Sequence, residues 1–321
     1  MSFVTVPMES QEFRNGFSRN PVFALLLISC VLATENARGQ DVEPRRWTPF
    51  PDGTNILGTA YARTSGDVLF DPVLLVEDAQ ADVDTLIVAY ARSFAFAGRL
   101  SRLDVIVPWQ NANWSGLLEG APASVSRVGL ADPSFRVSVN LFGAPAASGN
   151  ESQTYVANQD VSTLVGVAIA VTVPLGEYLD DKLLNLGSNR YIIRPQVGVV
   201  HTRGAWSYEL TGSTFFFTDN KKFLISSMRE QDPLYAVQAH LIRVFRPGLW
   251  SSLSAAYGWG GENTVDGVPG RDKSRVVLAA ISAGFPVAKA QGVSVSYIVN
   301  RTHEDTGSNL NTLTIGWSLL F

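Results

Sequence analysis

The sequence predicts an all-β protein, a transmembrane antiparallel up-and-down β-barrel of about twelve strands. Three observations support this prediction. Segments in which apolar and polar residues alternate recur along the chain from residue 54 onward. After residue 33, no apolar run approaches the ~20 residues that a transmembrane helix requires. Charged residues make up 17% of the chain, below the ~25% that is usual for soluble domains.

The N-terminus is expected to be a cleaved export signal. Basic residues precede an apolar stretch at 22–33, and small residues at 37–39 provide a cleavage site. Lipoprotein processing at Cys30 is a second interpretation, although a cut there would truncate the apolar stretch. Cys30 is the only cysteine, so the mature chain is expected to have no disulfide. The expected division is a signal peptide at 1–39, an N-terminal periplasmic segment at 40–53 and the barrel at 54–321.

Twelve segments have strand character, an even number as in bacterial single-chain barrels. In the third, fourth, seventh and eleventh segments, every second residue is apolar and the residues between are polar or charged. The second, eighth and tenth segments alternate less cleanly. In chain order, the expected strands lie near residues 54–65, 83–96, 100–110, 132–142, 163–174, 190–201, 205–217, 235–246, 249–260, 273–285, 291–301 and 310–321.

The last segment has the clearest pattern. One side is apolar and the other small and polar, which fits a wall with lipid outside and water inside. A soluble edge strand packed on a core is the alternative for this segment taken alone. The chain also ends like the signal that the barrel assembly machinery reads, here Thr314, Gly316, Leu319 and Phe321.

The connections alternate in length, as expected for short periplasmic turns and long outer loops. Short turns occur near residues 98, 204, 248 and 288, and the long connections are 66–82, 111–131, 175–189, 218–234 and 261–272, with 302–309 shorter. One long connection, 143–162, falls on the periplasmic side by count. Either it folds against or into the lower mouth, or one strand is miscounted.

The face opposite the lipid side is expected to line a wet bore. Paired arginines and carboxylates there are costly to desolvate unless water or partners satisfy them. These side chains either fill and stiffen the barrel or form a polar constriction that selects what passes. The predicted lumen-lining residues are Arg102, Asp104, Arg136, Asn140, Arg194, Gln196, Glu209, Gln238 and His240.

Several other functions are not supported. The 25 basic and 29 acidic residues give no charge excess for nucleic acid. Acidic loop residues lack EF-hand spacing, and no metal site or cofactor is predicted. No catalytic residues are predicted, because none of the three histidines has a serine two residues away on the same strand face. Serine–histidine pairs across neighbouring strands stay open.

Between residues 45 and 321 the chain resembles the bacterial outer-membrane family named for the meta-pathway of phenol degradation. The matching blocks are RWTPFPDGTN (46–55), TSGDVLFDP (64–72), GLADPSFRVSVNLFGAP (129–145), TDN (218–220), REQDPL (229–234) and RPGLW (246–250). The resemblance implies an outer-membrane barrel for passive movement of small, aromatic or hydrophobic compounds. It implies no established substrate and no catalytic motif.

The sequence therefore predicts an exported, monomeric, non-enzymatic channel in the outer membrane of a Gram-negative-type bacterium. Its expected partners are outer-membrane lipid and lipopolysaccharide, the barrel assembly machinery and a small-molecule solute. The alternatives are a structural or adhesive barrel without flux, a lipid-modifying enzyme, and lateral release of an apolar solute through a gap in the wall.

Overall fold

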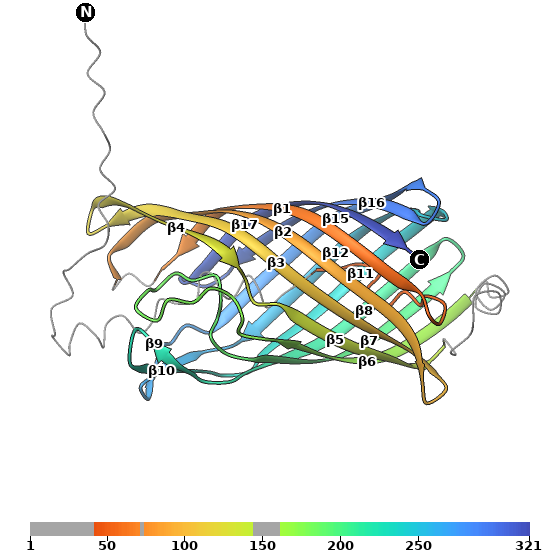
Figure 1. Cartoon of the computed structure of the whole chain (residues 1–321). Helices are drawn as coiled ribbons and strands as arrows, with labels where there is room; N and C mark the ends of the chain where they lie inside the picture. Colours follow the sequence, from red (N-terminus) through yellow and green to blue (C-terminus); the bar gives the residue numbers. More distant parts are fainter. Residues whose placement is uncertain (1–41, 71–73, 144–160) are drawn as a thin grey trace, which may run out of the picture.

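Most strands of the chain form one antiparallel sheet that closes on itself (Figure 1). The computed structural model describes residues 42–70, 74–143 and 161–321. The sheet contains β1 (Asn55–Leu69), β2 (Val76–Phe96), β3 (Arg99–Leu118), β4 (Ala121–Leu130), β5 (Ser134–Phe142), β6 (Val161–Thr172), β7 (Ile192–Arg203), β8 (Trp206–Phe217), β11 (Leu234–Arg246), β12 (Leu249–Gly260), β15 (Ser274–Ala288), β16 (Gln291–Thr302) and β17 (Gly307–Leu320).

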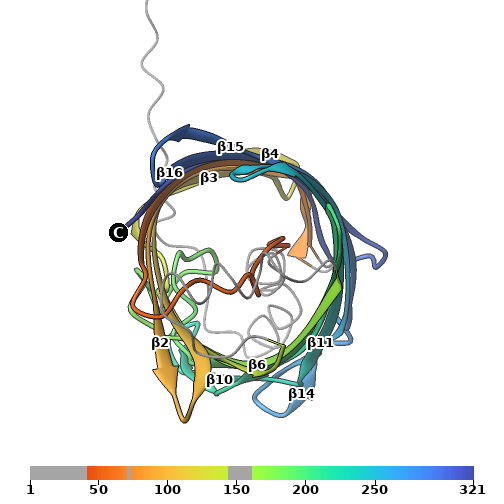
Figure 2. The same ribbon diagram turned by 90° about the vertical axis from the view of Figure 1, so that its right-hand side faces the viewer.

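The wall of the barrel consists of twelve strands, because β4 and β5 are two parts of one strand that both pair with β3. Closure comes from β17, which pairs with β1 from Ile56↔Leu320 to Leu69↔Gly307. At its very end, the backbone N–H of Phe321 donates to the carbonyl of Asn55 at 2.9 Å. The predicted twelve-stranded antiparallel barrel is confirmed, and the end-on view in Figure 2 shows the closed ring.

The strands separate their side chains as the alternation predicts. In β8, Tyr208 and Leu210 are 51% and 53% exposed on the outer face, whereas Glu209 and Thr211 are 5% and 3% exposed on the inner face. A belt of exposed apolar side chains outside a polar interior is the arrangement of an outer-membrane barrel. Lipid covers such a belt, so the exposure to solvent that would destabilise a soluble protein does not arise.

The connections differ between the two ends of the barrel. Four turns at one end, which we call the turn end, are tight, and some have glycines in the left-handed region, such as Gly98 with φ 72° and Gly204 with φ 55°. At the opposite end, the loop end, four of the connections are longer or fold into further strands. The predicted alternation in length between tight turns and longer connections is largely borne out.

Two of the predicted long loops are wrong. Most of 66–82 and 111–131 continues as strand, so that β2 and β3 reach 21 and 20 residues and project beyond the barrel. Only Glu119 and Gly120 join β3 to β4. Side chains in this region still alternate between the two faces of each strand. Both faces become partly polar where the strands leave the lipid, and for this reason the sequence of the segment resembles that of a loop.

Predicted loops 218–234 and 261–272 instead build a small separate sheet. It contains β9 (Asn220–Phe223), β10 (Ser227–Gln231), β13 (Asn263–Val265) and β14 (Val268–Pro269). The expected signal peptide at 1–39, with Cys30, and the central part of the connection 143–162 lie outside the described residues. Within the described ranges, no helix is long and apolar enough to cross a membrane.

Candidate functional site

Residues 42–53, which we call the N-terminal segment, start inside the barrel and lead to β1. In Figure 2 this segment, at the red end of the colour scale, crosses the interior. Val42 is buried against inward-facing residues of β12 and β15, among them Ala256 and Leu278. The segment therefore occupies part of the bore. The prediction that residues 40–53 are a periplasmic segment did not anticipate these contacts.

Trp47 anchors the N-terminal segment to the inner wall. It is 3% exposed, and its indole Nε1 donates to Oγ1 of Thr211 at 2.8 Å. The ring lies on Gly166 and Gly198, which are ladder partners on β6 and β7. A Cβ on Gly198 would lie 2.1 Å from Cε2 of the indole, so only glycine leaves this space. The guanidinium of Arg136 lies over the ring, with Cζ 4.7 Å from its centroid.

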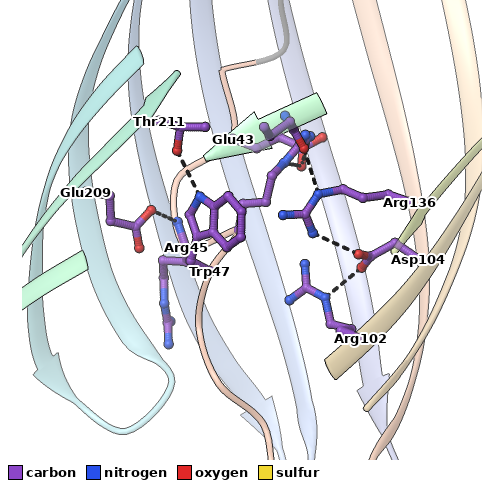
Figure 3. A network of polar contacts seen from close by, with 10 residues as sticks. Glu43, Arg45, Trp47, Arg102, Asp104, Arg136, Glu209 and Thr211 are labelled. Carbon is purple, nitrogen blue, oxygen red and sulfur yellow. Dashed lines mark hydrogen bonds and ion pairs between the residues drawn. The ribbon is translucent and has the colours of Figure 1, made fainter. Parts of the chain in front are cut away.

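A network of charged side chains lies beside Trp47 (Figure 3). One oxygen of Asp104 forms an ion pair with Nε of Arg102 at 2.8 Å, and the other accepts a hydrogen bond from Nη1 of Arg136 at 3.1 Å. Nε of Arg136 also donates to Oε1 of Gln196 at 2.9 Å. These residues come from β3, β5 and β7, and the closure of the sheet brings them together. The network places the predicted Arg102, Asp104, Arg136 and Gln196 in direct contact.

Glu209 and Arg194 contact different partners. Glu209 accepts the backbone N–H of Arg45 at 2.9 Å, so this carboxylate holds the N-terminal segment. The guanidinium of Arg45 lies over Trp250, with Cζ 5.3 Å from the ring centroid. Arg194 lies over Phe215 at 4.5 Å. Sequence reasoning did not foresee that residues before the first strand would contact this wall.

The remaining predicted residues are also buried on the inner face. Asn140 and Gln238 are 8% and 4% exposed, and Nδ1 of His240 lies 2.8 Å from Oγ of Ser254 on the neighbouring strand. This contact is an across-strand serine–histidine pair of the kind that the sequence left open. It faces the bore and not the lipid. The structure thus places all nine predicted residues on the inner wall, and their role in selectivity stays a prediction.

The opposite part of the inner wall carries no charge. Its inward-facing side chains are small or hydroxylated. They are Gly58, Ala60 and Ala62 on β1, Ser294 and Ser296 on β16, and Thr312, Thr314, Gly316 and Ser318 on β17. The bore is therefore asymmetric, with charges on the side of β3 to β8 and small neutral residues on the side of β1 and β17.

Sequence reasoning missed a packed cap at the loop end. The connection at residues 173–191 lies against the projecting parts of β1 to β4, where Leu186 is completely buried next to Trp114 and Leu310. Leu184 packs against the same cluster. The several leucines of this connection could have predicted the cap, because an exposed loop seldom contains so many apolar side chains.

Asp132 ties the two ends of this cap together. Its carboxylate accepts the backbone N–H of Gly176 at 2.8 Å and of Ser188 at 2.7 Å. It also accepts the hydroxyl of Ser188 at 2.6 Å. Asp132 lies in the short break between β4 and β5, and this break directs its carboxylate toward residues 173–191.

Two carboxylates of the predicted outer loops form ion pairs on the surface. Asp82 lies on β2 and pairs with Arg63 at 2.7 Å, while Asp181 pairs with Lys182 at 2.8 Å. Across 42–70, 74–143 and 161–321, no group of three or more His, Cys, Asp or Glu is arranged to hold a metal ion.

The predicted insertion signal lies at the seam of the barrel. Thr314 and Gly316 face inward on β17, and Phe321 is 65% exposed next to the first strand. This position at the last strand suits recognition by assembly machinery before closure, and the recognition itself stays a prediction.

Three solved structures are similar to this chain, and the first of them supports the fold. The COG4313 outer membrane channel from Pseudomonas putida F1 is 20% identical, with a TM-score of 0.71 over 88% of this chain and 100% of that chain. The transport unit of the autotransporter AIDA-I from Escherichia coli is 9% identical, with a TM-score of 0.48 over 87% and 92%. The translocator domain of NalP from Neisseria meningitidis is 10% identical, with a TM-score of 0.45 over 90% and 98%.

Among curated protein sequences, none matches this chain significantly. A family model described as MetA-pathway of phenol degradation matches residues 62–315. This match covers most of the barrel wall, and the structural similarity to the COG4313 channel agrees with the outer-membrane fold that the sequence predicts. The chain thus belongs to the MetA-pathway of phenol degradation family, whose outer-membrane β-barrel fold it has.

Proposed function

We propose that this protein is a passive channel for small aromatic or hydrophobic solutes in the outer membrane. One observation carries the proposal: a closed wall surrounds a polar, charged bore that the N-terminal segment narrows. A purely structural barrel could be filled by apolar side chains without the cost of removing guanidinium groups from water. A wet path through the bore explains why these groups are tolerated.

The dimensions limit the solute to a small size. Twelve strands ~4.8 Å apart and tilted by ~40° place the backbone on a radius of about 12 Å, before side chains are added. Trp47 and its neighbours take up part of this space. A folded partner does not fit, whereas a single-ring compound does. The similar protein from P. putida F1 is an outer membrane channel, which supports the same function.

Axial passage is favoured over lateral release. Each of the twelve wall strands is paired on both sides, including β17 with β1, although the β4 part of the fourth strand pairs with β3 alone. No seam of the described wall therefore lacks hydrogen bonds along its whole length. The charged side chains lie inside the barrel and not at an opening to lipid. We also propose a monomer, inserted by the assembly machinery after removal of residues 1–39 and surrounded by lipopolysaccharide in the outer leaflet.

An enzyme is the less favoured function. His240 and Ser254 are in contact, but the nearby carboxylate of Glu209 accepts the backbone of Arg45. A triad needs that carboxylate to orient the histidine. The pair also faces the bore, while a lipid-modifying enzyme needs access from the bilayer.

Ion conductance of the purified protein in planar bilayers tests the proposal. A channel gives discrete current steps at a voltage of either sign. Uptake of benzene derivatives by a deletion strain, with and without the gene restored, then tests the solute class. Absence of current together with unchanged uptake would show that the barrel is structural or adhesive.

A further inference from the structure

The cap at residues 173–191 folds into the mouth of the barrel at the loop end. Leu186 is completely buried in one apolar cluster with Val68, Ala81 and Leu310. By the alternation along β1, β2 and β17, these three residues belong to the inner face of the wall. Figure 1 shows the cap as the green trace at the left, between β4 and β9. The cap therefore lies inside the rim of the barrel.

The strands that Leu186 contacts are distant from those that carry the cap. The cap leaves β6 and returns to β7. Around the ring, β8, β11, β12, β15 and β16 separate β7 from β17, and the β4–β5 strand, β3 and β2 separate β6 from β1. Contact with β1 and β17 therefore requires the cap to extend over part of the mouth.

The base of the cap is narrow and fixed to the wall. The backbone N–H of Gly187 donates to the carbonyl of Glu177 at 2.8 Å, next to the bonds that Asp132 accepts from Gly176 and Ser188. A Cβ on Gly187 would lie 2.7 Å from the carbonyl oxygen of Gly176, so a larger residue does not fit there. Residues 177–187 are thus a compact loop whose two ends meet, as in an Ω-loop.

The interior of this loop is held together by Asn185. Its Oδ1 accepts the backbone N–H of Leu179 at 2.8 Å. Its Nδ2 donates to the carbonyls of Leu179 and Lys182 at 3.1 and 2.9 Å. Asn185 is 8% exposed, so these bonds lie within the loop and not on its surface. A loop with such internal bonds moves about its base as one body.

The tip of the loop touches the barrel in two places. On the side of the small sheet, the backbone N–H of Ile225 donates to the carbonyl of Asp180 at 2.7 Å, and the hydroxyl of Tyr178 donates to the carbonyl of Lys222 at 3.1 Å. On the far side, the contact is the apolar cluster around Leu186. Neither contact includes the base of the loop, so the tip can separate from the wall while the base stays attached.

We propose that residues 177–187 are a lid on the outer mouth, closed by Leu186 against the inner face of β1 and β17. In the closed position the lid narrows the axial path. When Leu186 leaves the cluster, the lid turns about its base and the path widens. This inference rests on the proposed channel function and adds a control of entry at the loop end, apart from the N-terminal segment.

Single-channel recording of Leu186→Ala tests the lid. Loss of a buried leucine side chain weakens the closed position, so the fraction of time at a larger conductance should rise at least ~10-fold over the wild type. Leu175→Ala is the matched control, because Leu175 lies in the same connection but is 61% exposed, and it should conduct like the wild type. Both variants are also recorded in a Trp47→Ala background, so that the N-terminal segment does not hide the effect.

A polar methanethiosulfonate reagent provides a second measurement. It should react with the Leu186→Cys variant only while the lid is open, and the added group should then keep the conductance at the larger level until a reductant removes it. The Leu175→Cys variant should react at once, without a change in conductance.

Equal conductance of the wild type and Leu186→Ala in both backgrounds would overturn the lid while the channel function stands. If no variant carries current, the channel function fails, and the reagent still decides the question of the lid in the detergent-solubilised protein. Reaction of the Leu186→Cys variant would then show that the lid opens, and absence of reaction would overturn it.

Discussion

Replacement of Trp47 by alanine should widen the channel, because Trp47 is the main anchor of the N-terminal segment. The indole is 3% exposed, donates a hydrogen bond of 2.8 Å to Thr211 and lies under the guanidinium of Arg136. Truncation of a buried aromatic side chain to alanine costs about 3–5 kcal/mol. At 1.4 kcal/mol per decade, the ratio of docked to undocked segment should fall by a factor between about 10² and about 4,000.

Single-channel recording of Trp47→Ala measures this change. We expect a larger conductance or frequent transitions to a larger conductance level, while the barrel itself stays folded as judged by its heat-modifiable migration in gels. Gly198→Ala should give the same result, since its Cβ would lie 2.1 Å from the indole.

Gly212→Ala is the matched control for the glycine variant. Nothing lies within 4 Å of the position of a Cβ on Gly212, so this substitution should leave the conductance unchanged. Trp109→Ala, on the outer face with 52% exposure, controls for loss of a tryptophan. If Trp47→Ala and Gly198→Ala both conduct like the wild type, the N-terminal segment does not limit the current and our account of the constriction is wrong.

Three further predictions concern the cap, the small sheet and the C-terminus. Asp132→Ala removes the acceptor of three hydrogen bonds from Gly176 and Ser188, so limited proteolysis should cut residues 173–191 faster in an intact barrel; an unchanged cleavage rate would contradict this. Burial raises the pKa of Asp272 to about 6, so the folded state holds the proton more tightly than the unfolded state does. The small sheet at the loop end should therefore lose stability as the pH rises from about 4 through 6. Hydrogen exchange of residues 263–269 against pH measures this, and Asp272→Asn should abolish the trend. Deletion of Phe321 should lower the amount of assembled barrel in the outer membrane several-fold, and normal assembly of this variant would exclude the insertion signal.

The residue pattern was sufficient for the wall of the barrel. In β17, Leu313 and Ile315 alternate with Thr314 and Gly316, and this period of two fixes which side faces lipid. The same local rule places Arg102 and Glu209 inside the barrel. It failed where β2 and β3 leave the membrane, because there the lipid no longer demands an apolar outer face.

The pairings across the bore could not be predicted. Trp47 reaches Thr211, which is 164 residues away in the sequence, and no local pattern relates the two. The gap that receives the indole arises because Gly166 and Gly198 become ladder partners only when β6 pairs with β7. In a single sequence, each of these glycines looks like any other residue of a strand.

The sequence by itself determined the barrel, the number of its strands and the side on which each strand is polar, because alternation is a local property of each strand and the bilayer acts on every strand alike. Only the tertiary structure decided that the N-terminal segment enters the bore, that Trp47 is held there and that the loop end carries a packed cap. Those contacts join residues far apart in the chain, and their free energy depends on shapes that exist only after the sheet has closed.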